Sequence, residues 1–145
     1  MSAKRKTYRA AVYVILKKNG KYLLIRRYNT GYRDGQYTFP AGHVDDGETA
    51  VDAAVRELGE EVATRTRKSN LRLVHVMQHR EGEHDYFDFY FMVSKWSGKP
   101  RICEPDKIDD LRWLSFDDLK VVAIPSITQA ILEIDNGELF SSIVL

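Results

Sequence analysis

The segment from residue 42 to residue 61 holds the greatest density of side chains that could do chemistry. Glu57 and Glu61 are four residues apart, and Glu60 follows Glu57 by three. On a helix these spacings place all three carboxylates on one face, where like charges repel one another. A divalent cation with oxygen ligands, Mg²⁺ above all, would turn this repulsion into binding. The glycine turn ahead of the helix could bring the backbone carbonyl of Gly42 to the same ion.

Two further residues of this segment have opposite charges. Glu48 lies in the turn and Arg56 lies on the expected helix, so that they are placed to pair and to brace the turn against the helix. The alternative for any three glutamates is a solvent-exposed helix face without a binding function, because runs of charge usually lie in water. The complete pattern of fixed residues argues against it, since six such residues would recur by chance roughly once per ten million positions.

At these residues the sequence resembles the Nudix hydrolase family, whose box reads G-x5-E-x7-R-E-U-x-E-E-x-G-U, with U a bulky aliphatic residue. The matching residues are Gly42, Glu48, Arg56, Glu57, Leu58, Glu60 and Glu61. The final G-U pair is Ala63-Thr64 here, and we expect altered loop geometry there rather than lost catalysis. The flanks at residues 23–42 and 96–113 are similar to MutT-like members, so that the resemblance covers about residues 8–132.

The resemblance implies a Nudix-type α/β/α sandwich with a mixed sheet, in a single domain spanning residues 1–145. It also implies hydrolysis of a pyrophosphate linkage in a nucleoside di- or triphosphate or a nucleoside-diphosphate derivative. Mg²⁺ is the expected cofactor, with Mn²⁺ also possible. Glu57 and Glu61 are then the first-choice metal ligands, and Glu60 and the Gly42 carbonyl complete the shell. Metals bound to carboxylates and phosphates would offset the negative charge that repels a nucleophile.

The general base is left open between two candidates. One is a glutamate of the box; the other is Glu104, which lies where some MutT-like members place an additional glutamate. Cys103, the chain's one cysteine, has no neighbouring base and is not expected to act as a nucleophile. We interpret His79 and His84, which flank an acidic turn, as solvent or hairpin residues, because a zinc site needs a tighter ligand set.

Substrate-binding candidates lie outside the box. Arg26 and Arg27 end a strand near the expected site, where arginine could clamp phosphates, although either could be a surface charge. Tyr86, Asp88 and Tyr90 share one face of another strand, so that a base could stack on the tyrosines while the carboxylate accepts from an exocyclic amine. Packing of that face under the final helix is the alternative. The family's substrate markers are mostly absent, and the base is therefore unassigned.

Three functions remain open at this point. The first is a small-molecule nucleotide hydrolase, and the second is a non-catalytic nucleotide- or ADP-ribose-binding module. The third is an RNA 5′-end pyrophosphohydrolase. Retention of the whole glutamate set argues against the second function. A net charge of +1, from 22 Lys and Arg against 21 Asp and Glu, argues against the third, because stable nucleic-acid binding usually needs a basic surface.

The elements that must position these residues follow from hydrophobic periodicity, which predicts an α/β domain with helices packed on a mixed sheet. Asn19-Gly20 between two apolar runs predicts a tight hairpin. Residues 80–84 are expected to form a turn. The predicted strands are residues 8–16, 22–27, 71–78, 85–93 and 111–114, with a short extended piece at 37–39. The predicted helices are residues 49–63 and a segment from Pro125 to Asn136-Gly137, with a brief one near Ser115.

The chain of 145 residues has the length of one domain. A single cysteine excludes a disulfide within the chain. We find no run of 18 apolar residues that could cross a membrane, and no signal peptide in the basic segment 1–9. The expected compartment is therefore the cytoplasm. Whether the protein is a monomer or a homodimer is left open.

Overall fold

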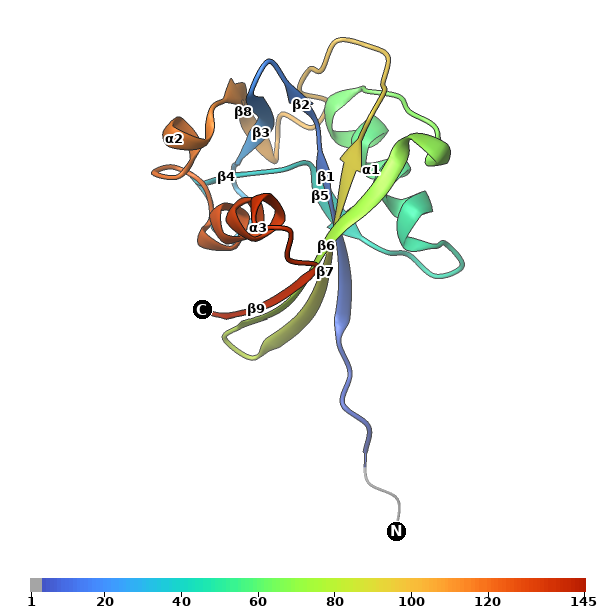
Figure 1. The fold of residues 1–145 in the computed structure, drawn as a ribbon, viewed down its shortest axis with the longest axis vertical. Helices are drawn as coiled ribbons and strands as arrows, with labels where there is room; N and C mark the ends of the chain where they lie inside the picture. Colours follow the sequence, from blue (N-terminus) through green and yellow to red (C-terminus); the bar gives the residue numbers. More distant parts are fainter. Residues whose placement is uncertain (1–3) are drawn as a thin grey trace.

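The computed structural model describes residues 4–145, and the first three residues of the expected domain and of the basic segment 1–9 lie outside it. Figure 1 shows two sheets with helices beside them. The strands are β1 (Arg9–Ile15), β2 (Lys17–Lys18), β3 (Lys21–Arg27), β4 (Tyr37–Thr38), β5 (Ala41–His43), β6 (Leu71–Glu81), β7 (His84–Val93), β8 (Ile108–Leu114) and β9 (Phe140–Val144). The helices are α1 (Ala50–Val62), the 3-10 helix η1 (Lys68–Asn70), α2 (Phe116–Leu119) and α3 (Pro125–Asp135).

The larger sheet has five strands in the order β5-β1-β7-β6-β9. Strand β1 runs parallel to β7 and antiparallel to β5, while β6 is antiparallel to β7 and parallel to β9. The second sheet contains β2, β3 and β4, with β8 paired to β3. Because parallel and antiparallel pairs share one sheet, the predicted mixed sheet is confirmed.

Alternation along β1 divides the interior into two cores, one on each face of the larger sheet. Val12 and Val14 point to a core that contains the buried residues of α1. Tyr13 and Ile15 point to a second core that contains α3 and part of the second sheet. The larger sheet is therefore covered on both faces, as the apolar character of both faces of β1 predicts.

Helix α1 begins at a capping box, in which Thr49 and Asp52 satisfy each other's backbone N–H groups. It ends at Ala63, which has a left-handed backbone with φ of 56°. Glycine adopts this conformation without the cost that a Cβ imposes. Ala63 stands where the Nudix box has glycine, so that the helix ends in a left-handed cap at a residue poorly suited to it. Thr64, which follows, is buried.

Most predicted elements are present, with shifted ends. The Asn19-Gly20 hairpin joins β2 to β3 and is confirmed. The turn expected at residues 80–84 is wrong in extent, because cross-strand pairing continues to Glu81 opposite His84. Strand β9 was not predicted. Its residues alternate between half-buried and exposed positions, and it completes the edge beside β6.

Candidate active site

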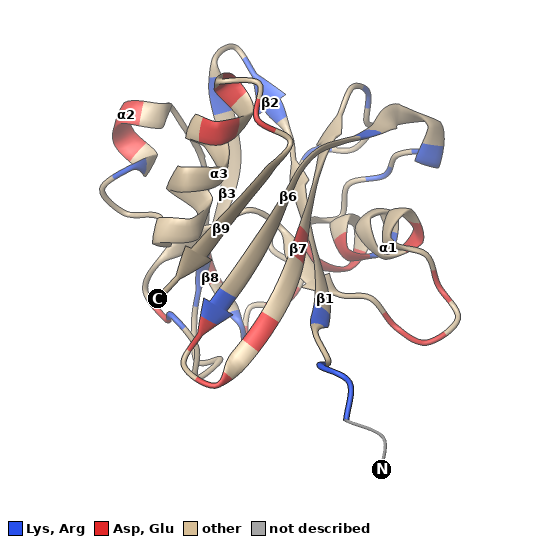
Figure 2. Ribbon diagram, turned by 60° about the horizontal axis from the view of Figure 1, so that its bottom comes forward, with Lys and Arg blue, Asp and Glu red and all other residues tan. Residues whose placement is uncertain are grey.

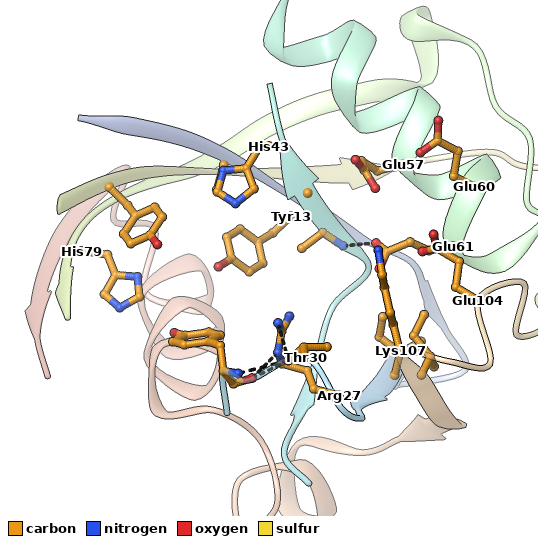
Figure 3. A pocket seen from close by; sticks show the side chains of 17 residues that line it. Tyr13, Arg27, Thr30, His43, Glu57, Glu60, Glu61, His79, Glu104 and Lys107 are labelled. Carbon is orange, nitrogen blue, oxygen red and sulfur yellow. Dashed lines mark hydrogen bonds between the residues drawn. The ribbon is translucent and has the colours of Figure 1, made fainter. Parts of the chain in front are cut away.

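A pocket of about 450 Å³ opens between the two sheets beside the C-terminal half of α1. It has two chemically different ends (Figure 3). Carboxylates from α1 and the loop before β8 lie at one end, whereas aromatic and imidazole rings lie at the other. Arg27 lies between them on the side of the second sheet. We call these the acidic end and the aromatic end.

The acidic end contains the glutamates that the sequence singled out. Glu57, Glu60, Glu61 and Glu104 all line the pocket, together with Gly42. A Cβ at residue 42 would lie only 2.1 Å from the carboxyl carbon of Glu57. Gly42 is therefore required for backbone and carboxylate to come this close. The expected grouping of the α1 glutamates with Gly42 is present.

Arg56 connects the box glutamates to the preceding turn. Its Nη2 donates to Glu48 Oε1 at 2.6 Å and to the His43 carbonyl at 3.0 Å. Its Nη1 donates to Glu57 Oε1 at 2.8 Å and to Glu60 Oε2 at 3.2 Å. The expected Glu48–Arg56 brace is thus present. Arg56 also restrains two of the carboxylates that line the pocket.

Glu61 accepts a hydrogen bond from the Ala41 backbone N–H at 2.7 Å, which holds its carboxyl against the first residue of β5. Burial, reinforced by the nearby charges of Glu57 and Glu104, raises the pKa of Glu61 to about 8. Burial likewise raises the pKa of Glu57 above its ordinary value. These shifts arise because desolvation and like charges both disfavour the ionised form.

These carboxylates suit a divalent cation in their chemistry. They are oxygen donors, of which Glu57 and Glu61 are partly buried, and a cation would relieve their repulsion. Within residues 4–145, no three His, Cys, Asp or Glu side chains stand at metal-binding spacing. The hydrogen bonds above explain this, because Arg56 and the Ala41 N–H each hold a carboxylate. The four glutamates nevertheless lie around one end of the same pocket (Figure 3).

The aromatic end is built from strands β1, β6 and β7 and the loop before β4. Tyr13, Tyr32, His79 and Tyr86 line it. The rings of His79 and Tyr86 are stacked, with centroids 5.5 Å apart and planes inclined by 29°. Flat rings at this spacing form a surface on which another planar ring can stack.

The substrate-binding candidates lie in different places. Arg27 lines the pocket, whereas the Arg26 Nε donates to Asp109 at 2.7 Å on the outside. A register shift between these residues in the pairing of β3 with β8 accompanies this divergence. Tyr86 lines the pocket. Asp88 and Tyr90 are fully buried and do not line the pocket, and Asp88 Oδ2 lies 3.0 Å from His79 Nδ1.

Sequence reasoning missed several pocket residues and misjudged one. His79 was expected to be a solvent or hairpin residue; it does belong to the β6–β7 hairpin, but only 2% of it is exposed, so that the solvent alternative is wrong. Its side chain points inward because residue 79 continues strand β6, whose alternation also buries His75 and Met77. Tyr13, Thr30, Tyr32 and Lys107 were also missed. Alternation along β1 could have found Tyr13, but the others lie in or beside loops without a periodic pattern.

Comparison with known proteins agrees with this architecture. The NUDIX domain family model matches residues 6–133. The ADP-ribose pyrophosphatase of Methanocaldococcus jannaschii is 29% identical over 118 residues, which cover 77% of this chain and 69% of that protein. The NAD-capped RNA hydrolase NudC of Pseudomonas putida is 30% identical over 109 residues, which cover 73% of this chain but 36% of that protein. The crystal structure of the MutT NUDIX hydrolase from Burkholderia pseudomallei is similar, with a TM-score of 0.80 at 26% identity, covering 88% of this chain and 98% of that one.

Proposed function

Because this chain belongs to the Nudix hydrolase family, we propose that it cleaves the pyrophosphate linkage of a small nucleotide with the help of a divalent cation. The substrate class is a nucleoside di- or triphosphate or a nucleoside-diphosphate derivative. One observation carries the proposal. Four glutamates and Gly42 gather at one end of a pocket whose other end is aromatic, with Arg27 between them.

A cation of the Mg²⁺ or Mn²⁺ type fits the acidic end. Glu57 and Glu61 would hold it, with Glu60, Glu104 and the Gly42 carbonyl as further donors. Bound there, it would supply the positive charge that offsets the repulsion between a phosphate and its nucleophile. Arg56 would keep Glu57 and Glu60 in place, because it donates to both while it is anchored on Glu48.

The remaining pocket residues would bind the substrate. Arg27 would donate to phosphate oxygens, and Lys107, on the same side of the pocket, would add a second positive charge. The nucleobase would stack on Tyr86, beside Tyr13. The general base stays between a box glutamate and Glu104. Glu57, Glu60, Glu61 and Glu104 line the pocket, whereas Glu48 pairs with Arg56. The raised pKa of Glu61 means that this carboxyl keeps a proton near neutral pH until a cation displaces it.

A substrate panel tests the proposal. The panel contains the eight common nucleoside and deoxynucleoside triphosphates, ADP-ribose and NADH, with release of phosphate, pyrophosphate or nucleotide measured with and without Mg²⁺. We expect turnover of at least one compound, dependent on the cation. The double variant Glu57→Gln with Glu61→Gln should lose at least about 10³-fold in rate, because two ligands are removed. Binding of nucleotides without turnover would favour the non-catalytic module instead.

One observation favours a second candidate, hydrolysis at the 5′ end of RNA. Exposed basic residues gather on the loops after α1 and before β8 and at the start of β6: Arg65, Arg67, Arg72, Lys95, Lys99 and Arg101. Figure 2 shows blue segments on these loops near α1. Backbone hydrogen bonds between Arg65 and Ser97 join the two loops. Within the described part of the chain, residues 4–145, none of these six side chains forms a salt bridge.

This basic surface leads toward the acidic end. The N–H of Arg101 donates to the carbonyl of Val62, and that of Cys103 donates to the carbonyl of Glu61. An RNA strand with its 5′ end in the pocket would have phosphates within reach of this surface. Turnover of a 5′-triphosphorylated ten-nucleotide RNA, but not of free nucleotides, would favour this candidate. Replacing Arg65, Arg67 and Lys95 by Ala should then slow RNA turnover and leave nucleotide turnover unchanged.

A further inference from the structure

A buried imidazole at the aromatic end has no role in the chemistry described above. His79 Nδ1 lies 3.0 Å from Asp88 Oδ2, and its Nε2 lies 3.1 Å from Glu81 Oε1. A carboxylate only accepts hydrogen bonds, so that both contacts are satisfied when both ring nitrogens carry a proton. His79 therefore forms the middle of a carboxylate–imidazole–carboxylate chain under the pocket.

Glu81 continues this chain to the loop that follows β3. Its Oε1 also accepts from the Tyr32 hydroxyl at 2.7 Å, and its Oε2 accepts from Arg33 Nε at 2.8 Å. Tyr32 and Arg33 belong to residues 28–36, which join β3 to β4; we call this segment the capping loop. Glu81 lies on the β6–β7 hairpin of the other sheet. One side chain thus connects two segments that the chain sequence separates by almost fifty residues.

The capping loop in turn holds the arginine that faces the phosphate position. Arg27 Nε donates to the Tyr32 carbonyl at 2.6 Å, and its Nη2 donates to Thr30 Oγ1 at 3.0 Å. Its guanidinium also lies 5.0 Å from the centre of the Tyr32 ring. Tyr32 thus contacts Arg27 on one side and Glu81 on the other.

We propose that Glu81 is a positioning residue, which together with His79 fastens the capping loop over the pocket and thereby orients Arg27 toward a bound phosphate. That the ligand of Arg27 is a phosphate rests on the proposed function; that Glu81 fastens the loop does not. Glu81 would touch no substrate itself. Its effect would be on substrate binding rather than on the bond-breaking step.

The contacts of His79 make the attachment of the capping loop dependent on pH. Burial lowers the pKa of His79, but the hydrogen bonds and charges of Asp88 and Glu81 outweigh burial and raise it. Above that pKa the imidazole keeps only one N–H and can donate to only one of its two carboxylate partners. The attachment of the capping loop through Glu81 therefore weakens as pH rises. Several titratable and charged groups face His79 and its two carboxylate partners: Asp88, Tyr86, Glu81, Tyr32, Arg33, Tyr90 from β7, Tyr13 from β1 and His43 from β5.

Backbone hydrogen exchange of residues 28–36, read by mass spectrometry, tests the attachment without any need for turnover. We expect Glu81→Gln to speed this exchange about five- to tenfold, since the amide keeps the shape of the carboxylate but loses the charge that strengthens its hydrogen bonds. Tyr32→Phe, which removes only the hydroxyl, should act in the same direction. Glu83→Gln is the matched control, because Glu83 is exposed in the turn of the same hairpin.

The coupling to Arg27 is tested by the affinity for ADP, measured by titration calorimetry with Mg²⁺ present. Glu81→Gln should weaken ADP binding about fivefold relative to Glu83→Gln. For any nucleotide that is turned over, KM should rise while kcat stays within about twofold. Exchange in the wild type should also quicken as pH rises from 6.5 to 8.5, after correction for intrinsic rates, and this pH effect should vanish in Glu81→Gln.

Two results would overturn the proposal. Loop exchange in Glu81→Gln equal to that in Glu83→Gln would show that Glu81 does not fasten the loop. Faster exchange with unchanged ADP affinity would show that the loop does not orient Arg27. A panel without any turnover would contradict the proposed function while the exchange measurement still decides whether Glu81 holds the loop.

Discussion

The two ends of the pocket are built in different ways. The acidic end comes mainly from one short stretch, residues 42–61, in which a turn and a helix bring Gly42 and three glutamates together. The aromatic end takes one or two residues from each of β1, β6, β7 and the capping loop. A local assembly suits groups that must keep a strict mutual geometry. An assembly from distant segments allows binding properties to change without disturbing that geometry.

Among single substitutions, we expect the largest loss of activity from one that disrupts the backbone of the acidic end. Gly42→Ala places a Cβ where the Glu57 carboxyl lies, so that the flexible side chain must move away. We expect kcat to fall about 10²-fold while the protein still folds. The control is Gly59→Ala in the same box, where a Cβ meets nothing closer than 4.0 Å. Equal kcat values for the two variants would show that the contact of Gly42 with Glu57 has no catalytic importance.

A stability measurement sharpens the comparison, because the buried carboxyl of Glu61 at the acidic end should destabilise the fold. The pKa of Glu61 is raised from an ordinary 4.5 to about 8 in the folded protein, so that its ionisation opposes folding as pH rises between these values. Glu61→Gln, without divalent cations, should therefore stabilise the fold at pH 7 by about 1–3 kcal/mol. The gain should disappear near pH 4, and urea unfolding at both pH values checks it.

At the aromatic end we expect an effect on binding alone. Tyr86→Ala removes the ring that is stacked on His79 and exposed to the pocket. The KM for a nucleotide substrate should rise about tenfold, in line with roughly 1–3 kcal/mol for one stacked base. Steady-state kinetics should show kcat nearly unchanged. A loss confined to kcat would instead assign Tyr86 to the chemical step.

The smallest expected effect concerns the end of α1. Ala63 has a left-handed backbone that glycine adopts at lower cost. Ala63→Gly should stabilise the protein by roughly 0.5–1 kcal/mol and leave turnover unchanged. A thermal melt measures the gain. Destabilisation would indicate that the Ala63 side chain contributes packing that outweighs the backbone strain.

The same difference between local and distant assembly decides what the sequence could predict. The helix, its glutamates and the Glu48–Arg56 pair follow from spacing within twenty residues. Alternation along β3 predicts that Arg26 and Arg27 point to opposite faces, and Arg27 shares the pocket face with Ile25. Which of the two faces borders the pocket could not be predicted, because it depends on how the second sheet packs against the first. The burial of His79 depends on how far β6 extends past the expected turn. Its contacts with Asp88 and Glu81 depend on side-chain placement along the whole hairpin, which no local pattern contains.

Manganese binding followed by electron paramagnetic resonance tests the central claim most directly, because it needs no substrate. The claim is that the glutamates of α1 gather to hold a divalent cation. We predict that the wild type binds Mn²⁺ and that Mg²⁺ displaces it. The double variant Glu57→Gln with Glu61→Gln should bind at least tenfold more weakly, with a melting temperature no lower than that of the wild type. Equal Mn²⁺ affinity in the two proteins would contradict the account.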